Sequence, residues 1–423
     1  MGFTPAVVQP IPDVVRDNTL SLMTSGGLSN TGTERLRRVL AGHVQPGVMP
    51  GLVALVSRDH DTHVDALGTL AFDNPAPMQR DTIFRLASIT KLVTAVAAMM
   101  LVEDCRIRLD DAIDPWVPEL ANRRVLRSIG SDLTDTVPAN RAITLRDVLT
   151  YRMGFGSVMA MPGTHPIQQP IRELHIGGDG PMRPTHFPPV DEWLRRLGSL
   201  PLMAQPGERW LYHVSGDVLG ALVARVSGQT LGTFMQKRIF EPLGMADTSF
   251  FVPREKRVRL SASYWRDPQT GALQYFDDPN DTAWSSPSAF ESGGGGLVST
   301  IDDYFAFTRM LLHGGRHGRE QLLSPATVSL MTSDQLRPEQ RAGSGIFFGN
   351  HSSWGLGIAV DIAREEIYHA PGRYGWTGGF GTTAYTDPAQ GLIGILFTQR
   401  AMESPNPPKV FTDFWTAAYG AIA

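Results

Sequence analysis

The stretch SITKLVTAVAAMMLV, residues 88–102, decides how the chain is interpreted. Its apolar residues would lie on nearly every side of a helix, which predicts a buried helix beginning at Ser88. Ser88 and Lys91 are three residues apart, so their side chains share one face of that helix within hydrogen-bond reach. The stretch therefore predicts a hydroxyl and an amine held together in the interior.

The pairing of Ser88 with Lys91 has a chemical meaning. A serine hydroxyl is a poor nucleophile at neutral pH without an adjacent base, and a lysine serves as that base only when it is neutral. Because the pKa of lysine is normally about 10.4, burial or a helix N-terminus must lower it. Ser-x-x-Lys alone is a weak pattern, equally typical of a surface N-cap serine followed by a solvated lysine. Here it occurs once, directly before an apolar run, which favours Ser88 as nucleophile and Lys91 as general base.

Segments with the character of strands lie at both ends of the chain. Residues 51–57 and 62–67 are apolar or alternating around a turn, which predicts a hairpin. Later strand signals occupy Trp354–Val360, Gly379–Thr386 and Gly391–Thr398. Few convincing strands lie between these two groups.

Helical patterns flank and separate the strands. Thr31 with Glu34 three places on is a capping-box signal for a first helix. A later helix is bounded by Ser215 as N-cap and Gly228 as stop, and Val410–Tyr419 has the pattern of an amphipathic closing helix.

The order of these elements predicts the domain organisation. We expect an N-terminal arm over residues 1–20 and one α/β (α+β) domain built from residues 21–104 together with 287–423. Residues 105–286 form a mostly helical inserted domain, and the site lies in the cleft between the two. A length of 423 residues with 42% hydrophobic content is sufficient for such a core.

Charge and cysteine content exclude several classes of function. The net charge is −4 and the 38 basic residues are scattered, so we expect neither nucleic acid nor a membrane surface as partner. The single cysteine, Cys105, excludes an internal disulfide and a cysteine-based metal cluster. Because the histidines show no His-Glu-x-x-His spacing, we expect no metal site, and we expect no cofactor.

The expected location is the cytoplasm. The N-terminus has no basic segment followed by an apolar one, as a secretion signal requires. The longest apolar run, residues 92–102, is too short to span a bilayer.

Several further motifs carry a family resemblance. In chain order they are FRLASITK (84–91), ITLRDVLT (143–150), PGERWLY (206–212), FEPLGM (240–245) and GGGLVST (294–300). With these motifs the chain resembles the serine β-lactamase and DD-peptidase superfamily, and in particular class C β-lactamases and family VIII carboxylesterases. The resemblance implies an antiparallel sheet flanked by helices, with the active site in a cleft beside a mostly helical domain.

The resemblance also implies roles for single residues. Tyr212 matches the second-motif tyrosine, which shares protons with the lysine. Trp376, Thr377 and Gly378 match the third motif, on the strand that lines the site. The backbone amides of Ser88 and Gly379 are implied as the oxyanion hole.

Two departures from the family pattern bear on the substrate. Val214 stands where lactamases and peptidases have the asparagine of Tyr-x-Asn, and Trp376 replaces the lysine of Lys-Thr-Gly. Both changes favour a neutral ester over an anionic, amide-bearing substrate. Arg373, three residues before Trp376, is positioned to replace the missing charge, which leaves weak β-lactam hydrolysis open.

His213, adjacent to Tyr212, is interpreted as a structural residue. Neighbouring residues on an extended segment point to opposite faces, and the Ser-x-x-Lys mechanism needs no histidine. The absence of Gly-x-Ser-x-Gly argues against an α/β-hydrolase esterase.

We therefore expect a serine hydrolase that cleaves small carboxylic esters through an acyl-enzyme on Ser88. Lys91 acts as general base and Tyr212 as proton relay, and Trp376, Thr377, Gly378, Val214 and Arg373 line the substrate site. Three alternatives remain open: β-lactamase or D-amino-acid peptidase activity, acyl transfer to a specific acceptor, and a catalytically silent binding protein. The sequence does not predict the physiological substrate or the oligomeric state.

Overall fold

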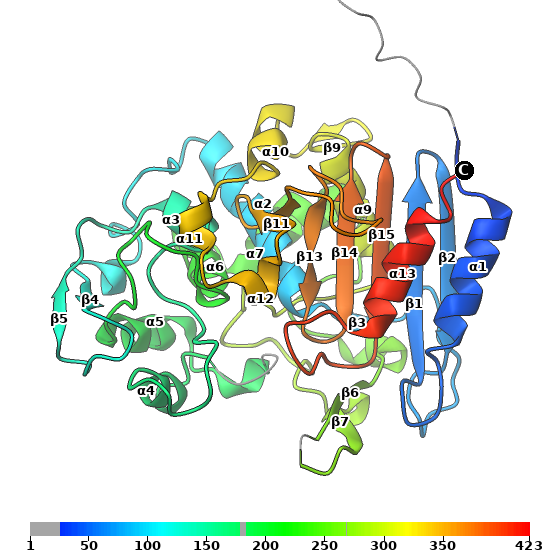
Figure 1. Cartoon of the computed structure of the whole chain (residues 1–423), viewed down its shortest axis with the longest axis horizontal. Helices are drawn as coiled ribbons and strands as arrows, with labels where there is room; N and C mark the ends of the chain where they lie inside the picture. Colours follow the sequence, from blue (N-terminus) through cyan, green and yellow to red (C-terminus); the bar gives the residue numbers. More distant parts are fainter. Residues whose placement is uncertain (1–25, 178–182, 268) are drawn as a thin grey trace, which may run out of the picture.

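A seven-stranded antiparallel sheet organises the chain (Figure 1). The computed structural model describes residues 26–177, 183–267 and 269–423, so the expected arm over residues 1–20 lies outside the described residues. The strand order is β11-β12-β13-β14-β15-β1-β2. In chain order the strands are β1 (Gly51–Arg58), β2 (Asp61–Gly68), β11 (Ser352–Trp354), β12 (Ala359–Asp361), β13 (Tyr374–Gly378), β14 (Thr382–Asp387) and β15 (Leu392–Thr398).

The sheet joins the two ends of the chain, because β1 pairs with β15 and Leu55 lies opposite Ile395. The hairpin expected over residues 51–67 is confirmed as β1 and β2. The single strand expected over Trp354–Val360 is wrong, because a turn containing Gly357 at φ 77° divides it into β11 and β12. Only glycine adopts such a turn without strain.

Two terminal helices cover one face of the sheet (Figure 1). These are α1 (Asn30–Ala41) and α13 (Lys409–Tyr419), whose apolar residues pack with Leu52, Ala54 and Val56 of β1. Residue alternation sends Val53 and Leu55 to the opposite face and the main core. The N-cap of α1 is Ser29, whose side chain accepts from the amide of Gly32, and not the expected Thr31.

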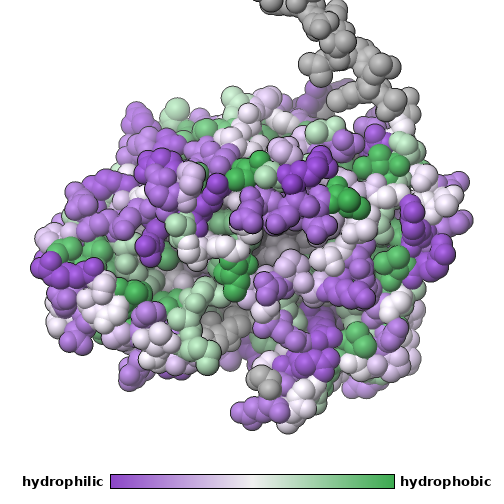
Figure 2. Space-filling model, in the orientation of Figure 1, coloured by the Kyte–Doolittle hydropathy of each residue, from purple (hydrophilic) through white to green (hydrophobic). Residues whose placement is uncertain are grey.

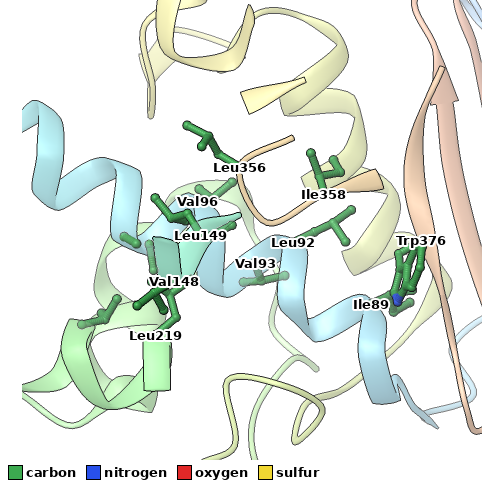
Figure 3. Close-up of a cluster of buried hydrophobic side chains, with 14 of the residues drawn as sticks. Ile89, Leu92, Val93, Val96, Val148, Leu149, Leu219, Leu356, Ile358 and Trp376 are labelled. Atoms are coloured by element: carbon green, nitrogen blue, oxygen red, sulfur yellow. The ribbon is translucent and has the colours of Figure 1, made fainter. Parts of the chain in front are cut away.

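Residues 90–101 of the helix α2 (Thr90–Glu103) are all buried. Leu92, Val93 and Val96 of this helix belong to the hydrophobic cluster drawn in Figure 3. The buried helix expected from the sequence is thereby confirmed. Its start differs, because Ala87–Ile89 form one turn of 3₁₀-helix and α2 begins at Thr90. Ser88 therefore lies in the tight turn before the helix and does not cap it. Ala87 enters this turn with a φ of 48°.

Helices and short strands fill the segment between β2 and β11. The helices are α3 (Leu145–Leu149), α4 (Gln168–Glu173), α5 (Val190–Ser199), α6 (Val214–Ser227), α7 (Leu231–Met235), α8 (Glu241–Leu243), α9 (Ile301–Leu312), α10 (Pro325–Met331), α11 (Pro338–Arg341) and α12 (Gly345–Phe348). The short strands form the pairs β3 (Phe84–Arg85) with β8 (Val298–Ser299), β4 (Arg124–Leu126) with β5 (Thr136–Pro138), β6 (Ser263–Arg266) with β7 (Leu273–Asp277), and β9 (Arg316–His317) with β10 (Glu320–Gln321).

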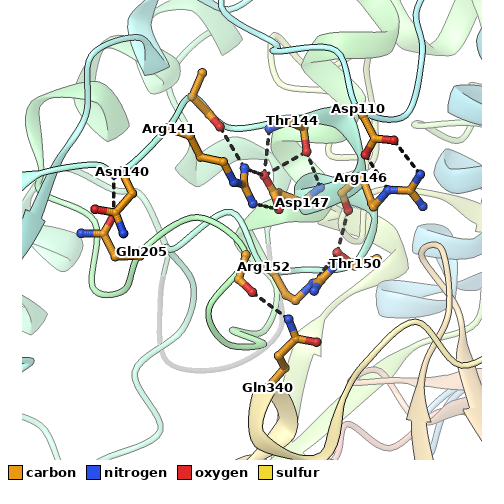
Figure 4. Close-up of polar contacts among 12 residues, drawn as sticks. Asp110, Asn140, Arg141, Thr144, Arg146, Asp147, Thr150, Arg152, Gln205 and Gln340 are labelled. Carbon is orange, nitrogen blue, oxygen red and sulfur yellow. Dashed lines mark hydrogen bonds and ion pairs between the residues drawn. The ribbon is translucent and has the colours of Figure 1, made fainter.

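A polar network surrounds the start of α3 and reaches Gln340 (Figure 4). Asp147 accepts from the guanidinium of Arg141 and from Thr144, which caps α3. The Gln340 side chain donates to the carbonyl of Gly207 at 2.8 Å. Two backbone hydrogen bonds hold the segment just before Tyr212. Trp210 N donates to Gln340 O at 2.7 Å, and Leu211 N donates to Tyr151 O at 2.8 Å.

Hydrophilic residues dominate the face of the molecule shown in Figure 2, and hydrophobic residues appear there in small separate groups. Among the described residues, no helix combines the length and the apolar character needed to cross a membrane.

Candidate active site

Ser88, Lys91 and Tyr212 come together from three parts of the fold. Lys91 Nζ lies 3.0 Å from Ser88 Oγ, and the Tyr212 hydroxyl donates to the same oxygen at 2.8 Å. Ser88 lies in the 3₁₀ turn, Lys91 in the first turn of α2, and Tyr212 just before α6. The spacing of Ser88 and Lys91 thus has the consequence expected from the sequence, although the two residues lie on either side of a helix start.

The end of β13 presses against the turn that carries Ser88. A Cβ on Gly378 would lie 2.3 Å from the carbonyl oxygen of Leu86 and 2.2 Å from Thr382 Oγ1, so only glycine fits there. The Thr382 hydroxyl donates to the same Leu86 carbonyl at 2.7 Å. Gly379 follows directly after the strand, beside the Ser88 turn. The glycine of the third motif therefore sets the distance between the strand and Ser88.

The amine of Lys91 is buried, with 1% of the residue exposed. Besides Ser88 it contacts the carbonyl of Gly294, to which it donates, and His213 Nδ1 at 3.2 Å. Burial lowers the pKa of Lys91 to about 7, against a smaller opposing effect of the Asp217 carboxylate. A substantial fraction of Lys91 is therefore neutral near pH 7, as a general base requires.

His213 contacts Lys91, so the expectation that its side chain points away from the site of Tyr212 is wrong, whereas the expected structural role stays a prediction. The amide of Val214 donates to the carbonyl of Tyr212 at 3.2 Å, and His213 between them has φ 79° and ψ −65°. These angles define a classic γ-turn, which is rare and strained. The turn brings the side chains of Tyr212 and His213 to one site. No sequence pattern predicts this turn. His213 also replaces Ser215 as the residue before α6.

Asp217 stands behind His213, one turn into α6. Its Oδ1 accepts from the Ser292 hydroxyl and from the amide of Gly294 at 3.0 Å. Its Oδ2 faces His213 Nε2 at 3.6 Å. Burial raises the pKa of Asp217, while burial and the charge of Lys91 hold the pKa of His213 well below its usual value. Sequence reasoning missed Asp217 because Ser292 and Gly294 lie far from it along the chain.

Trp376 approaches the site from β13, and its indole Nε1 donates to the Tyr212 hydroxyl at 3.0 Å. Phe347 of α12 packs on the Tyr212 ring with a centroid separation of 4.6 Å, and Trp354 meets Trp376 edge to face at 4.9 Å. These aromatic side chains half-bury the phenol. Burial raises the pKa of Tyr212, and the hydrogen bonds to Ser88 and Trp376 partly oppose that effect.

Val214 and Thr377 lie near these residues, but neither side chain makes a polar contact with them. Val214 begins α6 and is buried in the main hydrophobic core. Thr377 lies opposite Thr383, whose hydroxyl accepts from the Trp415 indole of α13 at 3.3 Å. Residues paired across antiparallel strands share a face, so register places Thr377 on the α13 side and Trp376 on the Ser88 side.

Arg373 does not supply a positive charge to the site, and this expectation from the sequence is wrong. Its guanidinium is buried and paired with Asp361 at 3.0 Å. It stacks over the rings of Tyr385 and Trp415 at 3.9 and 4.3 Å. Strand alternation is the reason, because a residue three positions from Trp376 faces the opposite side of the sheet.

Three potential metal ligands lie close together away from Ser88. Ligand atoms of His351, Glu365 and His369 lie within 4.8 Å of one another. The two imidazole rings are stacked, with centroids 3.6 Å apart and an interplanar angle of 10°. Stacked rings direct their nitrogen lone pairs side by side rather than toward one point, so this geometry fits ring stacking better than tetrahedral coordination. The expected absence of a metal site stays a prediction.

Comparison with known proteins agrees with the expected family resemblance. The family model described as Beta-lactamase matches residues 36–411. Protein Rv1367c of Mycobacterium tuberculosis is 36% identical over 361 residues, which cover 84% of this chain and 86% of that protein. Lovastatin esterase of Penicillium rubens is 31% identical over 377 residues, which cover 83% of this chain and 89% of the esterase.

Solved structures give the same fold. The structure of EstCE1, described as a hydrolase with promiscuous acyltransferase activity, matches with a TM-score of 0.76 at 24% identity. The match covers 92% of this chain and 99% of EstCE1. The expected fold class, an antiparallel sheet flanked by helices, is confirmed.

Proposed function

Because the chain belongs to the beta-lactamase family, with esterases among its relatives, we propose that it is a serine carboxylesterase of the family VIII type acting on small neutral esters. The observation that carries the proposal is the convergence of Lys91 Nζ and the Tyr212 hydroxyl on Ser88 Oγ, at 3.0 and 2.8 Å. A buried hydroxyl between a neutral amine and a phenol is arranged for proton removal and attack on a carbonyl.

In the proposed acylation step, Ser88 Oγ attacks the ester carbonyl carbon while its proton moves to Lys91 Nζ. The carbonyl oxygen becomes an oxyanion, which accepts from the backbone amides of Ser88 and Gly379. The C–O bond to the alcohol then breaks. The leaving alkoxide takes a proton from Tyr212, and the Lys91 ammonium then gives its extra proton to the Tyr212 phenolate, so that both groups are neutral in the acyl-enzyme.

Deacylation reverses these roles. Water attacks the acyl carbon and gives one proton to the Tyr212 and Lys91 pair. The tetrahedral intermediate collapses, the acid leaves, and Ser88 Oγ recovers a proton. No metal, nucleic acid or membrane takes part in the proposal.

Two features support a neutral substrate. Trp376 occupies the position where the family's lysine attracts a carboxylate, and its indole is committed to Tyr212. Arg373, the other candidate cation, is buried on the opposite side of β13 with Asp361. The aromatic wall of Tyr212, Phe347 and Trp376 favours a short apolar acyl group.

The test is turnover of p-nitrophenyl acetate and butyrate, followed by mass spectrometry of the quenched enzyme. We expect a burst of p-nitrophenol and an acyl group on the peptide that contains Ser88. Ser88→Ala is expected to lose the burst and at least 1,000-fold of the turnover. The exposed Ser333→Ala serves as matched control. Full activity in Ser88→Ala, or an acyl group on another residue, overturns the proposal.

Acyl transfer is the second candidate, because EstCE1 is described as a hydrolase with promiscuous acyltransferase activity. Adding an alcohol or amine acceptor to the same assay separates the two activities. If the enzyme is an acyltransferase, the acylated acceptor should form in larger amounts than the free acid. Nitrocefin turnover tests the β-lactamase alternative in parallel.

A further inference from the structure

Three groups surround Lys91 Nζ, and together they determine where its lone pair points. A neutral amine has two N–H donors and one lone pair. The carbonyl of Gly294 accepts only, so it takes one N–H. The remaining N–H and the lone pair must be divided between Ser88 Oγ and His213 Nδ1.

Trp376 determines which group donates in the hydrogen bonds at Ser88. An indole N–H is a donor and never an acceptor, so Trp376 must donate to the Tyr212 oxygen. The Tyr212 proton is then directed at Ser88 Oγ. Ser88 receives that bond, and its own proton is free to point at the lone pair of Lys91.

Asp217 determines which nitrogen of His213 carries the proton. Its Oδ1 is occupied by Ser292 and Gly294, which leaves Oδ2 facing His213 Nε2 at 3.6 Å. A carboxylate favours the tautomer with the proton on Nε2. In that tautomer Nδ1 is an acceptor directed at Lys91.

We propose that His213 is a positioning residue which, oriented by Asp217, accepts one N–H of the Lys91 amine and thereby directs the amine's lone pair at the hydroxyl of Ser88. The inference rests on the proposed function and extends it by two residues. After Lys91 takes the proton from Ser88, its third N–H points back at Ser88 Oγ, while Gly294 and His213 still accept the other two. The ammonium is thus fully bonded without any other group moving.

The γ-turn at His213 is consistent with this role. A non-glycine residue at φ 79° is strained, and such strain is characteristic of functional sites. Without the turn, the His213 and Tyr212 side chains would point in opposite directions.

The test compares three variants with the wild-type chain. In His213→Asn the amide oxygen replaces Nδ1 as acceptor, whereas His213→Leu removes it. Asp217→Asn offers an N–H to Nε2 and favours the wrong tautomer. We expect kcat/KM to fall about 100-fold in His213→Leu and 10- to 100-fold in Asp217→Asn, but less than about 5-fold in His213→Asn. His63 and Asp65, a similar pair on β2 at 2.8 Å, provide the controls His63→Leu and Asp65→Asn.

The pH profile separates positioning from a structural role. Loss of an acceptor from the ammonium form lowers the pKa of Lys91, so the acid limb of kcat/KM should move to lower pH in His213→Leu. It should stay in place in His213→Asn. Equal losses in both His213 variants with an unchanged limb, at matched melting temperatures, overturn the inference.

A second measurement keeps the two proposals distinguishable. The rate at which a fluorophosphonate labels Ser88 depends on its activation and needs no knowledge of the natural ester. Labelling of wild type that slows about 100-fold in His213→Leu supports the inference even if the tested esters are poor substrates. Equal labelling rates overturn the inference alone, whereas no labelling of wild-type Ser88 overturns the proposed function together with it.

Discussion

The indole nitrogen of Trp376 lies 3.0 Å from the phenol oxygen of Tyr212 and donates to it. Removing this donor takes away the hydrogen bond that the Tyr212 oxygen accepts, and with it one of the two contacts that direct the Tyr212 proton at Ser88. We expect Trp376→Phe to lower kcat on p-nitrophenyl butyrate about 10-fold, the value of one hydrogen bond. KM should change little, because the apolar surface remains. A kcat equal to that of wild type contradicts this role.

The pH dependence of activity should report Lys91. Its pKa of about 7 means that the amine is protonated below neutrality, so kcat/KM should fall tenfold for each pH unit below that value. The groups that face the amine are Asp217, which opposes the lowering, and His213, Tyr212 and Ser88. Initial rates between pH 5 and 9 provide the measurement, and a flat profile excludes Lys91 as the base.

The same buried amine should cost stability. Burial lowers the pKa of Lys91 in the folded state, so the unfolded state binds more protons between pH 7 and about 10.4, and the free energy of unfolding rises with pH there. Below pH 7 both states are protonated and the full penalty persists. Lys91→Met should therefore be inactive yet about 1–3 kcal/mol more stable at pH 6. Its advantage should shrink by pH 9, as measured by urea denaturation.

Gly378 should tolerate no side chain. A Cβ there would meet Leu86 O and Thr382 Oγ1 at 2.3 and 2.2 Å, and moving β13 away would displace Gly379 from the Ser88 turn. We expect Gly378→Ala to lower kcat at least 100-fold. Gly345→Ala is the control, because its Cβ would meet nothing within 4 Å. Equal kcat values for the two variants contradict the proposed spacing.

Arg373 should matter for folding and not for catalysis. Removing it leaves Asp361 buried without its partner, so Arg373→Met should lower the free energy of unfolding by about 3–5 kcal/mol. At a temperature where the variant is folded, kcat/KM for neutral esters should stay within twofold. A large rise in KM would contradict this prediction and indicate that Arg373 contributes to substrate binding.

The sequence predicts the parts of the site that depend on local spacing. Ser88 and Lys91 are three positions apart across the start of α2, and the apolar run after them indicates burial directly. The identity of Tyr212 came from motif resemblance, and its position beside Ser88 emerges only when the segment before α6 folds against α2.

Features that depend on backbone exceptions or distant contacts were not predictable. The extended conformation assumed for residues 212–214 fails at the γ-turn of His213, for which histidine gives no signal. The orientation of the Asp217 carboxylate depends on a hydrogen bond from Ser292, which lies seventy-five positions away in the sequence. The placement of Arg373 depends on which side chains of β13 face the site. Its short distance from Trp376 along the sequence does not give this information.

The pairing of β1 with β15 has a consequence for biosynthesis. Leu55 pairs with Ile395 on one side, so the central strands of the sheet cannot assemble until β15 has left the ribosome. Ser88, Lys91 and Tyr212 are synthesised long before β13 and β14 arrive to hold the turn around Ser88. Nascent chains therefore carry all three reactive groups before the strands that align them exist, and activity should appear only after β13, β14 and β15 have been synthesised and have joined the sheet.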